Sequence, residues 1–226
     1  MIKKTSAGLV AVSLCAAMSI LIVACDGDPY VEHNSGPDIS DLTRPVFAVP
    51  ITEIPTAAEN ALRASGFEFH KIGFGVGLEW DETKPNRPNV ALEYYTRDAE
   101  AEVRAPCDLY LEKIMDNEVG VGDMELELRT SSSSAYFIYI DHVRDLRFAE
   151  GAFIAQGQVI GLSGVSPEFR SELQVNFQEK TQDNRYHTIH FCPLDFGTED
   201  FIRAHTDFAP LEEWETLESI DGGYFG

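Results

Sequence analysis

Hydrophobic and polar residues alternate in short segments over most of the chain that follows Gly66. Successive side chains of a β-strand point to opposite faces, so a period of two predicts strands that are buried on one face. Clusters of turn-forming residues, such as Asp116-Asn117-Glu118 and Asp183-Asn184, separate these segments. Short strands with regular turns are typical of an antiparallel sandwich or barrel. The predicted strands span 103–105, 109–114, 124–128, 135–143, 153–162, 172–178 and 186–191.

Two segments depart from this alternation and predict short helices. Thr56–Ser65 is rich in alanine, and its threonine cap is followed three residues later by Glu59. The acidic segment Thr198–Leu217 is compatible with a second helix, in which Leu211 and Trp214 could pack back on the body. We therefore expect an all-β fold of antiparallel sheets with short N- and C-terminal helices and a loose, Gly-rich end.

The first 24 residues have the pattern of a secretory signal, with two lysines followed by an apolar run from Ala7 to Ala24. The run ends in Leu21-Ile22-Val23-Ala24-Cys25, which resembles the bacterial lipoprotein box, whose cysteine receives lipid. An ordinary secretory peptide and a single uncleaved membrane anchor are the alternatives. We expect lipidation of Cys25, because several acyl chains hold a protein firmly on a membrane. The protein would then be anchored in a bacterial cell envelope, on the periplasmic or the cell-surface side.

The remaining chain divides by composition into three parts. Residues 25–45 are polar and rich in Gly, Pro and Asp, which predicts a flexible tether after the lipidated cysteine. Residues 46–197 contain the alternating segments and form the predicted β domain, and residues 198–226 form the predicted helical tail. A chain of 226 residues is long enough for one domain of this kind.

The charge of the chain limits its partners. It carries 38 Asp and Glu residues against 17 Lys and Arg, a formal net charge of −21. Such a surface repels the phosphates of nucleic acids and the headgroups of anionic lipids. We expect no nucleic-acid partner, and we expect contact with a membrane only through the lipid anchor.

Two of the four cysteines remain in the body of the protein. Cys15 leaves with the signal, and Cys25 would carry lipid. Cys107 and Cys192 could form a disulfide in an oxidising compartment, or they could stay reduced. Neither belongs to a CxxC pair, so these cysteines do not predict a zinc site.

One block of sequence is more specific. Tyr139 and His142 end a predicted strand, and Glu150–Gly161 (EGAFIAQGQVIG) then reverses the chain through glycines. This block resembles the lysostaphin-type (LytM-like) zinc endopeptidase domain, although the family's Tyr-x-His has one residue fewer. Val103–Asp108 (VRAPCD) resembles the family's first core strand. The resemblance implies a barrel-sandwich fold, the duplicated hybrid motif. Lipoyl and biotinyl carriers share the hairpin, but they need a lysine that 124–143 lacks.

The family's zinc ligands and catalytic residues can be carried over one at a time. Its zinc is held by a His, by an Asp four residues later, and by the second His of a His-x-His motif. These positions correspond here to Asn89, Glu93 and Gln174. The first His of that motif corresponds to Glu172, and the catalytic His of Tyr-x-His corresponds to His142. Only His142 retains the residue type of the family.

These replacements remove the chemistry that the family uses. Zinc prefers imidazole, thiolate and carboxylate ligands, and neutral amide oxygens are poor substitutes. The resemblance therefore implies a protein without a zinc centre or other cofactor, and without confident catalytic residues. Its groove would bind a cell-wall fragment such as peptidoglycan, a glycan or an envelope protein. The expected groove residues are Asn89, Glu93, Tyr94, Tyr95, Tyr139, His142, Glu172 and Gln174.

Two other functions stay open. The first is a zinc metalloendopeptidase that acts on peptidoglycan with a rearranged site made of Glu93, His142 and either His187 or His190. The second is a purely structural envelope lipoprotein with no ligand in the groove. The acidic loop 116–125 does not follow the order of calcium ligands in an EF-hand, so a solvated turn is expected there.

Overall fold

A computed structural model describes residues 44–63, 66–69, 74, 77–78, 87–117, 122–165, 169–208 and 219–225. All of them belong to Asp38–Gly226, the second of the two units into which the chain divides. The predicted signal segment, the lipidation site Cys25 and almost all of the predicted tether lie outside the described residues. No helix among the described residues is long and apolar enough to cross a membrane.

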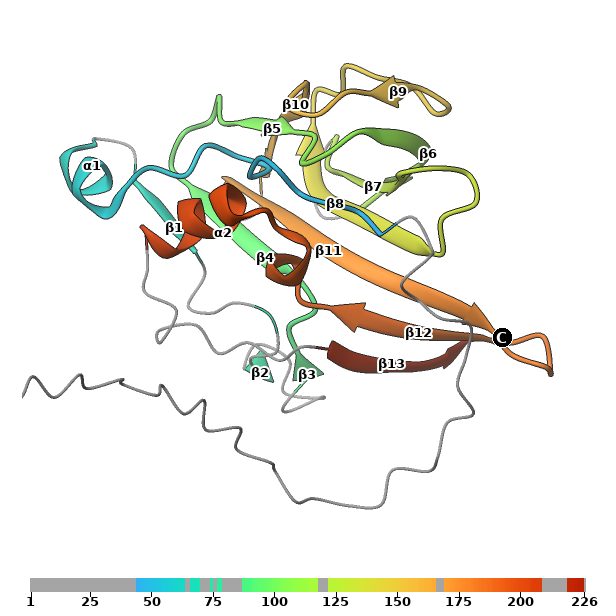
Figure 1. The fold of residues 1–226 in the computed structure, drawn as a ribbon. Helices are drawn as coiled ribbons and strands as arrows, with labels where there is room; N and C mark the ends of the chain where they lie inside the picture. Colours follow the sequence, from blue (N-terminus) through green and yellow to red (C-terminus); the bar gives the residue numbers. More distant parts are fainter. Residues whose placement is uncertain are drawn as a thin grey trace, which may run out of the picture. The chain divides into compact units, whose positions relative to one another are not determined.

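The described residues form one large, mainly antiparallel sheet and a small two-stranded one (Figure 1). The order in the large sheet is β1-β4-β11-β10-β8-β7-β6-β9, with β12 and β13 added beside β11 and β5 added beside β10. Three short helical segments complete the described part of the chain. The strands of the large sheet are β1 (Phe67–Phe69), β4 (Leu92–Thr96), β5 (Glu102–Arg104), β6 (Leu109–Asp116), β7 (Met124–Arg129), β8 (Tyr136–Arg144), β9 (Phe153–Ile154), β10 (Val159–Val165), β11 (Phe169–Lys180), β12 (Tyr186–Phe191) and β13 (Ser219–Phe225). The remaining elements are β2 (Gly77–Leu78), β3 (Arg87–Pro88), α1 (Ala57–Leu62), η2 (Pro193–Phe196) and α2 (Glu199–Thr206).

Strand β11 is the longest in the described chain and connects the parts of the sheet. Its first half pairs with β4 on one side, and 172–177 pair with β8 on the other. Its second half pairs with β12, which pairs in turn with β13. Residues from β4, β11 and β8 are thereby brought side by side, although they are far apart in the sequence (Figure 1).

The core lies on one face of these strands. Alternate residues of β11, namely Leu173, Val175 and Phe177, are buried there. They pack with apolar residues of β7 and β8, and with Phe47 and Phe201. Phe47 is held in place by a parallel bridge to Gly197, which brings the first described residues next to α2. The residues that alternate with them along the strand, such as Glu172 and Gln174, therefore point to the opposite face, which we call the outer face.

The predicted fold class is confirmed. The described chain is mostly antiparallel sheet, with short helices near its two ends. Each of the seven predicted strands is present, although 153–162 contains two strands, because Gly157 adopts a φ of 77° between them. The capping box that the sequence predicts at Thr56 and Glu59 is formed, with the Thr56 hydroxyl accepting from the Glu59 amide at 3.2 Å.

The tail differs from its prediction. Among the described residues of the tail, Glu199–Thr206 is a helix, and Ser219–Phe225 is a strand that pairs with β12 and not a loose end. The two adjacent glycines in this strand read as a turn in the sequence. Thr188 pairs with Gly223 and Ile189 with Asp221, so Gly222 is the extra residue of a bulge in β13. The predicted residues Leu211 and Trp214 lie outside the described residues.

Cys107 and Cys192 are free thiols, so the disulfide that the sequence allows is not formed. Both side chains are buried in the core, with 6% and 2% of their surface exposed. Burial raises the pKa of each thiol to about 12. A thiol with this pKa carries almost no thiolate at neutral pH, and the thiolate is the reactive form.

Candidate functional site

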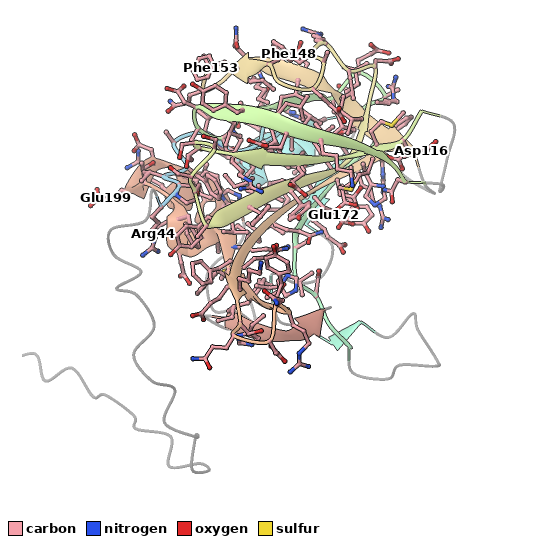
Figure 2. The ribbon with its side chains drawn as sticks, turned by 90° about the vertical axis from the view of Figure 1, so that its right-hand side faces the viewer. Arg44, Asp116, Phe148, Phe153, Glu172 and Glu199 are labelled. Carbon is pink, nitrogen blue, oxygen red and sulfur yellow. The ribbon has the colours of Figure 1, made fainter. Side chains whose placement is uncertain are left out.

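Three carboxylates stand in a row across the outer face of the sheet. Glu93 of β4 is directly opposite Glu172 of β11, which is directly opposite Asp141 of β8. Directly opposed residues of antiparallel strands share a face, so the three side chains project on the same side. Figure 2 shows Glu172 among the side chains of this face. Only 7% of Glu93 and 9% of Glu172 is exposed, which is unusual for acidic residues.

A β-bulge places His142 beside this row. Two residues of β8, Asp141 and His142, lie between the pairs Met124–Val143 and Leu126–Ile140, where β7 has one residue. His142 has a φ of 57°, which lets the strand accommodate the extra residue. The additional residue relative to the family's Tyr-x-His motif is thus absorbed locally, and Asp141 and His142 both reach the outer face.

Both ring nitrogens of His142 face carboxylates. Nδ1 lies 2.8 Å from Oδ2 of Asp123, and Nε2 lies 3.3 Å from Oε1 of Glu172. A second oxygen, Oδ2 of Asp141, is 3.7 Å from Nε2. The side chains of His142 and Asp123 are 3% and 2% exposed, so water screens these contacts little.

These contacts shift the pKa of the histidine. Burial lowers the pKa of His142, but the hydrogen bonds with Glu172 and Asp123 and the charges of Asp141 and Glu172 outweigh it. The net effect is a raised pKa, which favours the imidazolium form, with Nδ1 hydrogen-bonded to Asp123 and Nε2 facing Glu172. Burial and neighbouring carboxylates also raise the pKa of Asp141 and of Glu125, which indicates an excess of negative charge.

The other half of the site is a chain of hydrogen bonds that is joined to Glu172 by an ion pair. The Asn89 amide donates to Glu93 Oε1 at 3.2 Å, and the Tyr95 hydroxyl donates to Glu93 Oε2 at 3.1 Å. Arg170 donates to the Tyr95 hydroxyl at 3.2 Å and lies 3.6 Å from Glu172 Oε1. Burial and the charge of Glu93 raise the pKa of Tyr95 to about 12, which keeps its hydroxyl protonated.

The family's ligand positions do not fit zinc in this chain. The Asn89 amide group donates to Glu93, and its oxygen accepts from the Ala91 backbone at 3.0 Å, so both its nitrogen and its oxygen are engaged. Glu93 is the one carboxylate among the three positions, and Arg170 places a positive charge within the same hydrogen-bond chain. A site for zinc needs three good ligands and no competing cation. These residues therefore form an internal network of hydrogen bonds and charges.

The structure places most of the predicted groove residues on the outer face, in two groups. Asn89, Glu93, Tyr95, His142 and Glu172 belong to the network described above. Gln174 and Tyr139 are directly opposite each other on the same outer face. Tyr139 is also hydrogen-bonded to Glu127 at 3.1 Å.

Tyr94 is the one predicted groove residue that the structure places elsewhere. It is 1% exposed and points into the core, because it alternates with Glu93 and Tyr95 along β4. Its hydroxyl lies 2.9 Å from Nε2 of His205 on α2. Nδ1 of His205 donates to the Phe201 carbonyl at 2.7 Å, and burial lowers the pKa of His205 to about 4. Tyr94 and His205 therefore fasten α2 to the sheet.

The two histidines of the rearranged zinc site do not reach this network. His190 is directly opposite Asn176, four residues along β11 from Glu172. That separation is about 13 Å along a strand. His187 is opposite Glu179, which is farther along the same strand and on the other face. The ligand set of Glu93, His142 and His187 or His190 is therefore wrong.

Sequence reasoning missed several members of the network. Asp123 was expected in a solvated turn, yet it is buried against His142. Asn117 donates to Asp141 at 2.6 Å from the same loop region. Arg170 precedes the predicted strand at 172–178. It is two residues before Glu172, and this spacing is the signal that could have placed Arg170 on the same outer face.

Lysostaphin is among the solved structures that match this chain. LytU is 15% identical with a TM-score of 0.45, and the match covers 62% of this chain and 91% of that one. Lysostaphin from Staphylococcus simulans, described as an antimicrobial peptidase, is 14% identical with a TM-score of 0.43, over 65% and 55% of the two chains. A variant of the catalytic domain of the prophage-encoded protein EnpA from Enterococcus faecalis is 13% identical with a TM-score of 0.38, over 49% and 81%. No protein-family model and no curated protein matches the chain. The conclusions about chemistry therefore depend on this chain's own side chains.

Proposed function

We propose that this chain is a non-catalytic, peptidase-like lipoprotein of the cell envelope, which binds a cell-wall fragment, a glycan or a partner protein on its outer face. The observation that carries the proposal is the pairing of both His142 nitrogens with the carboxylates of Asp123 and Glu172. A general base needs a neutral imidazole with a free lone pair, and so does a metal ligand. A histidine whose two nitrogens both face carboxylates, and whose pKa is raised by them, is poorly suited to either role.

The neighbouring surface supports a role in binding. Beyond the network, the outer face carries Phe137, Tyr139 and Gln174, which are partly exposed. The rings of Phe137 and Tyr139 are stacked, with an interplanar angle of 15°, and the Arg129 guanidinium lies 3.9 Å from the centre of the Phe137 ring. Rigid aromatic rings with amide and charged neighbours are typical of surfaces that recognise sugars, peptides and proteins.

The binding experiment uses Gln174→Lys, because this residue is on the outer face and outside the charge network. The purified chain should sediment with isolated cell-wall sacculi or capture a protein from envelope extracts. Gln174→Lys should reduce the recovery severalfold, because it places a charge beside Tyr139. The matched control is Gln182→Lys in the exposed turn after β11, which should leave recovery unchanged. Equal recovery with both variants would contradict the proposal and would favour a purely structural lipoprotein.

A second candidate function is a metalloendopeptidase, and one observation favours it. Single ligand atoms of Asp123, Asp141 and His142 lie within 4.8 Å of one another, and these residue types are suitable for zinc. The same preparation should therefore be assayed for zinc after dialysis and for cleavage of crosslinked stem peptides. We expect neither, because His142 and the Asn117 amide already engage these carboxylates. About one equivalent of tightly bound zinc per chain would favour the enzyme instead.

The localisation is part of the same proposal. Lipid on Cys25 would hold the domain at a membrane, and the polar tether that follows, up to residue 45, would let the domain extend away from the membrane surface. Cells that express the chain with an alkyne-labelled fatty acid should yield labelled protein in the membrane fraction. Cys25→Ser should abolish the label and release the protein from membranes, whereas Cys15→Ser should not. Labelling that persists in Cys25→Ser would contradict lipidation at this position.

A further inference from the structure

A hollow separate from the charge network opens at the other end of the sheet. It has a volume of about 450 Å³ and lies between β6, the turn after β7 and the loop before β9. This volume is within the range of sites for small molecules, roughly 300–1,000 Å³. Figure 2 shows that Phe153 of β9 is well apart from Glu172. The residues that line the hollow are Tyr110, Leu111, Glu112, Ser131, Ser132 and Gly151.

An exposed aromatic pair borders this hollow. Tyr110 lines it, and Phe153 packs against Tyr110 with ring centroids 5.2 Å apart. The two residues are directly opposite each other on β6 and β9, and 43% and 50% of their surfaces are exposed. The other large hydrophobic residues that are exposed in the described chain are Val46, Leu62 and Tyr186. Of these five exposed residues, only Tyr110 and Phe153 form an aromatic contact with each other. Their ring planes are inclined by 58°, so the pair is a preformed apolar platform of two tilted rings, of which Tyr110 lines the hollow.

The walls of the hollow are polar. The Glu112 side chain forms no hydrogen bond or ion pair with another described side chain, so its carboxylate can accept hydrogen bonds from a ligand. The exposed Ser132 adds a hydroxyl group that can both donate and accept. Gly151 has a φ of 84°, and a Cβ atom built on it would meet nothing within 4 Å, so the backbone wall is open there.

We propose that this hollow binds an uncharged oligosaccharide. A pyranose ring has an apolar face of C–H groups, which can lie on the Tyr110–Phe153 platform, and hydroxyl groups at its rim, which can reach Glu112 and Ser132. The net charge of −21 and the Glu112 carboxylate disfavour an anionic ligand. The proposal does not depend on the function assigned to the outer face near Gln174.

The experiment is a calorimetric titration of the full-length chain with chitotetraose and, separately, with cellotetraose. At least one sugar should bind, and Tyr110→Ala should weaken that binding by about tenfold or more. Tyr110→Phe should retain most of the affinity, because it keeps the aromatic face. Tyr186→Ala is the matched control, since Tyr186 has a similar exposed fraction, 45%, on the distant strand β12.

Several results would overturn the proposal. These are the failure of both sugars to bind, equal affinities for Tyr110→Ala and Tyr186→Ala, or binding of the uncharged peptide tetraglycine as tight as that of either sugar. A thermal melt of Tyr110→Ala checks that the variant is folded. Because Tyr110→Ala leaves Gln174 intact, it should still sediment with sacculi or capture the envelope partner of the outer face. Failure of the sugar site is thereby distinguishable from failure of the proposed function.

Discussion

Replacing His142 with alanine is expected to lower the free energy of unfolding by about 3–5 kcal/mol. The substitution leaves the carboxylate of Asp123, which is 2% exposed, without its partner at 2.8 Å. It also removes the positive charge that lies next to Glu172 and Asp141. Urea unfolding followed by circular dichroism would measure the change. A loss below about 1 kcal/mol would contradict the buried ion pair, because a surface pair contributes no more than that.

A double variant tests whether the charge is the cause. Asp123→Asn together with His142→Leu removes both charges and keeps similar volumes, so it should be more stable than His142→Ala alone. A double-mutant cycle made of Asp123→Asn, His142→Leu and the double variant should give a coupling energy between the two sites of about 1 kcal/mol or more. If the two single effects simply add, the histidine contributes through packing and not through the ion pair.

The His142→Ala variant should also change how the free energy of unfolding depends on pH. Because the folded state raises the pKa of His142, the stabilisation is fully present below the unfolded pKa of about 6.5 and is lost as the pH rises through the folded value. The free energy of unfolding should therefore fall as the pH increases above about 6.5, and His142→Ala should flatten this fall. His205 acts in the opposite direction, because its pKa is lowered to about 4, so stability also falls as the pH drops from 6.5 toward 4.

Gly161→Ala is expected to destabilise the protein by about 3 kcal/mol or more. A Cβ atom on Gly161 would lie 2.5 Å from the backbone oxygen of Arg144 and 2.8 Å from Cγ1 of Val143. The clash with a backbone atom requires β10 to move away from the strand that carries the bulge. Thermal unfolding would measure the loss. Gly66→Ala is the matched control, because its nearest contacts are the flexible Arg97 side chain at 3.5 Å and beyond. Equal effects of the two substitutions would contradict this account.

Much of the fold could be predicted because the sheet is buried on one face. In β8 and β11, apolar residues such as Ile138, Ile140, Leu173 and Val175 alternate with polar ones, so the period of two is plain in the sequence. Strand β4 was missed for the opposite reason. All five residues of Leu92–Thr96 are buried, because the charge network covers the face that the core does not.

The site was predictable only in part. His142 and Glu172 were identified through the family resemblance, but Asp123 and Arg170 come from segments that no spacing rule connects to them. Their contacts depend on the register between strands and on the bulge at His142. Register across a sheet is set by long-range packing and turn geometry, so a single sequence does not disclose it. For the same reason, the wrong pairing of His142 with His187 or His190 could not be recognised before the strands were aligned.

Strand β13 has a practical consequence for anyone who shortens this protein. It covers the outward-facing amide and carbonyl groups of β12 over Tyr186–Phe191. A version that stops before Ser219 would uncover those groups and offer them to another molecule as a template for pairing. Such a truncated protein is therefore prone to self-association, so binding studies are better performed with the final residues retained.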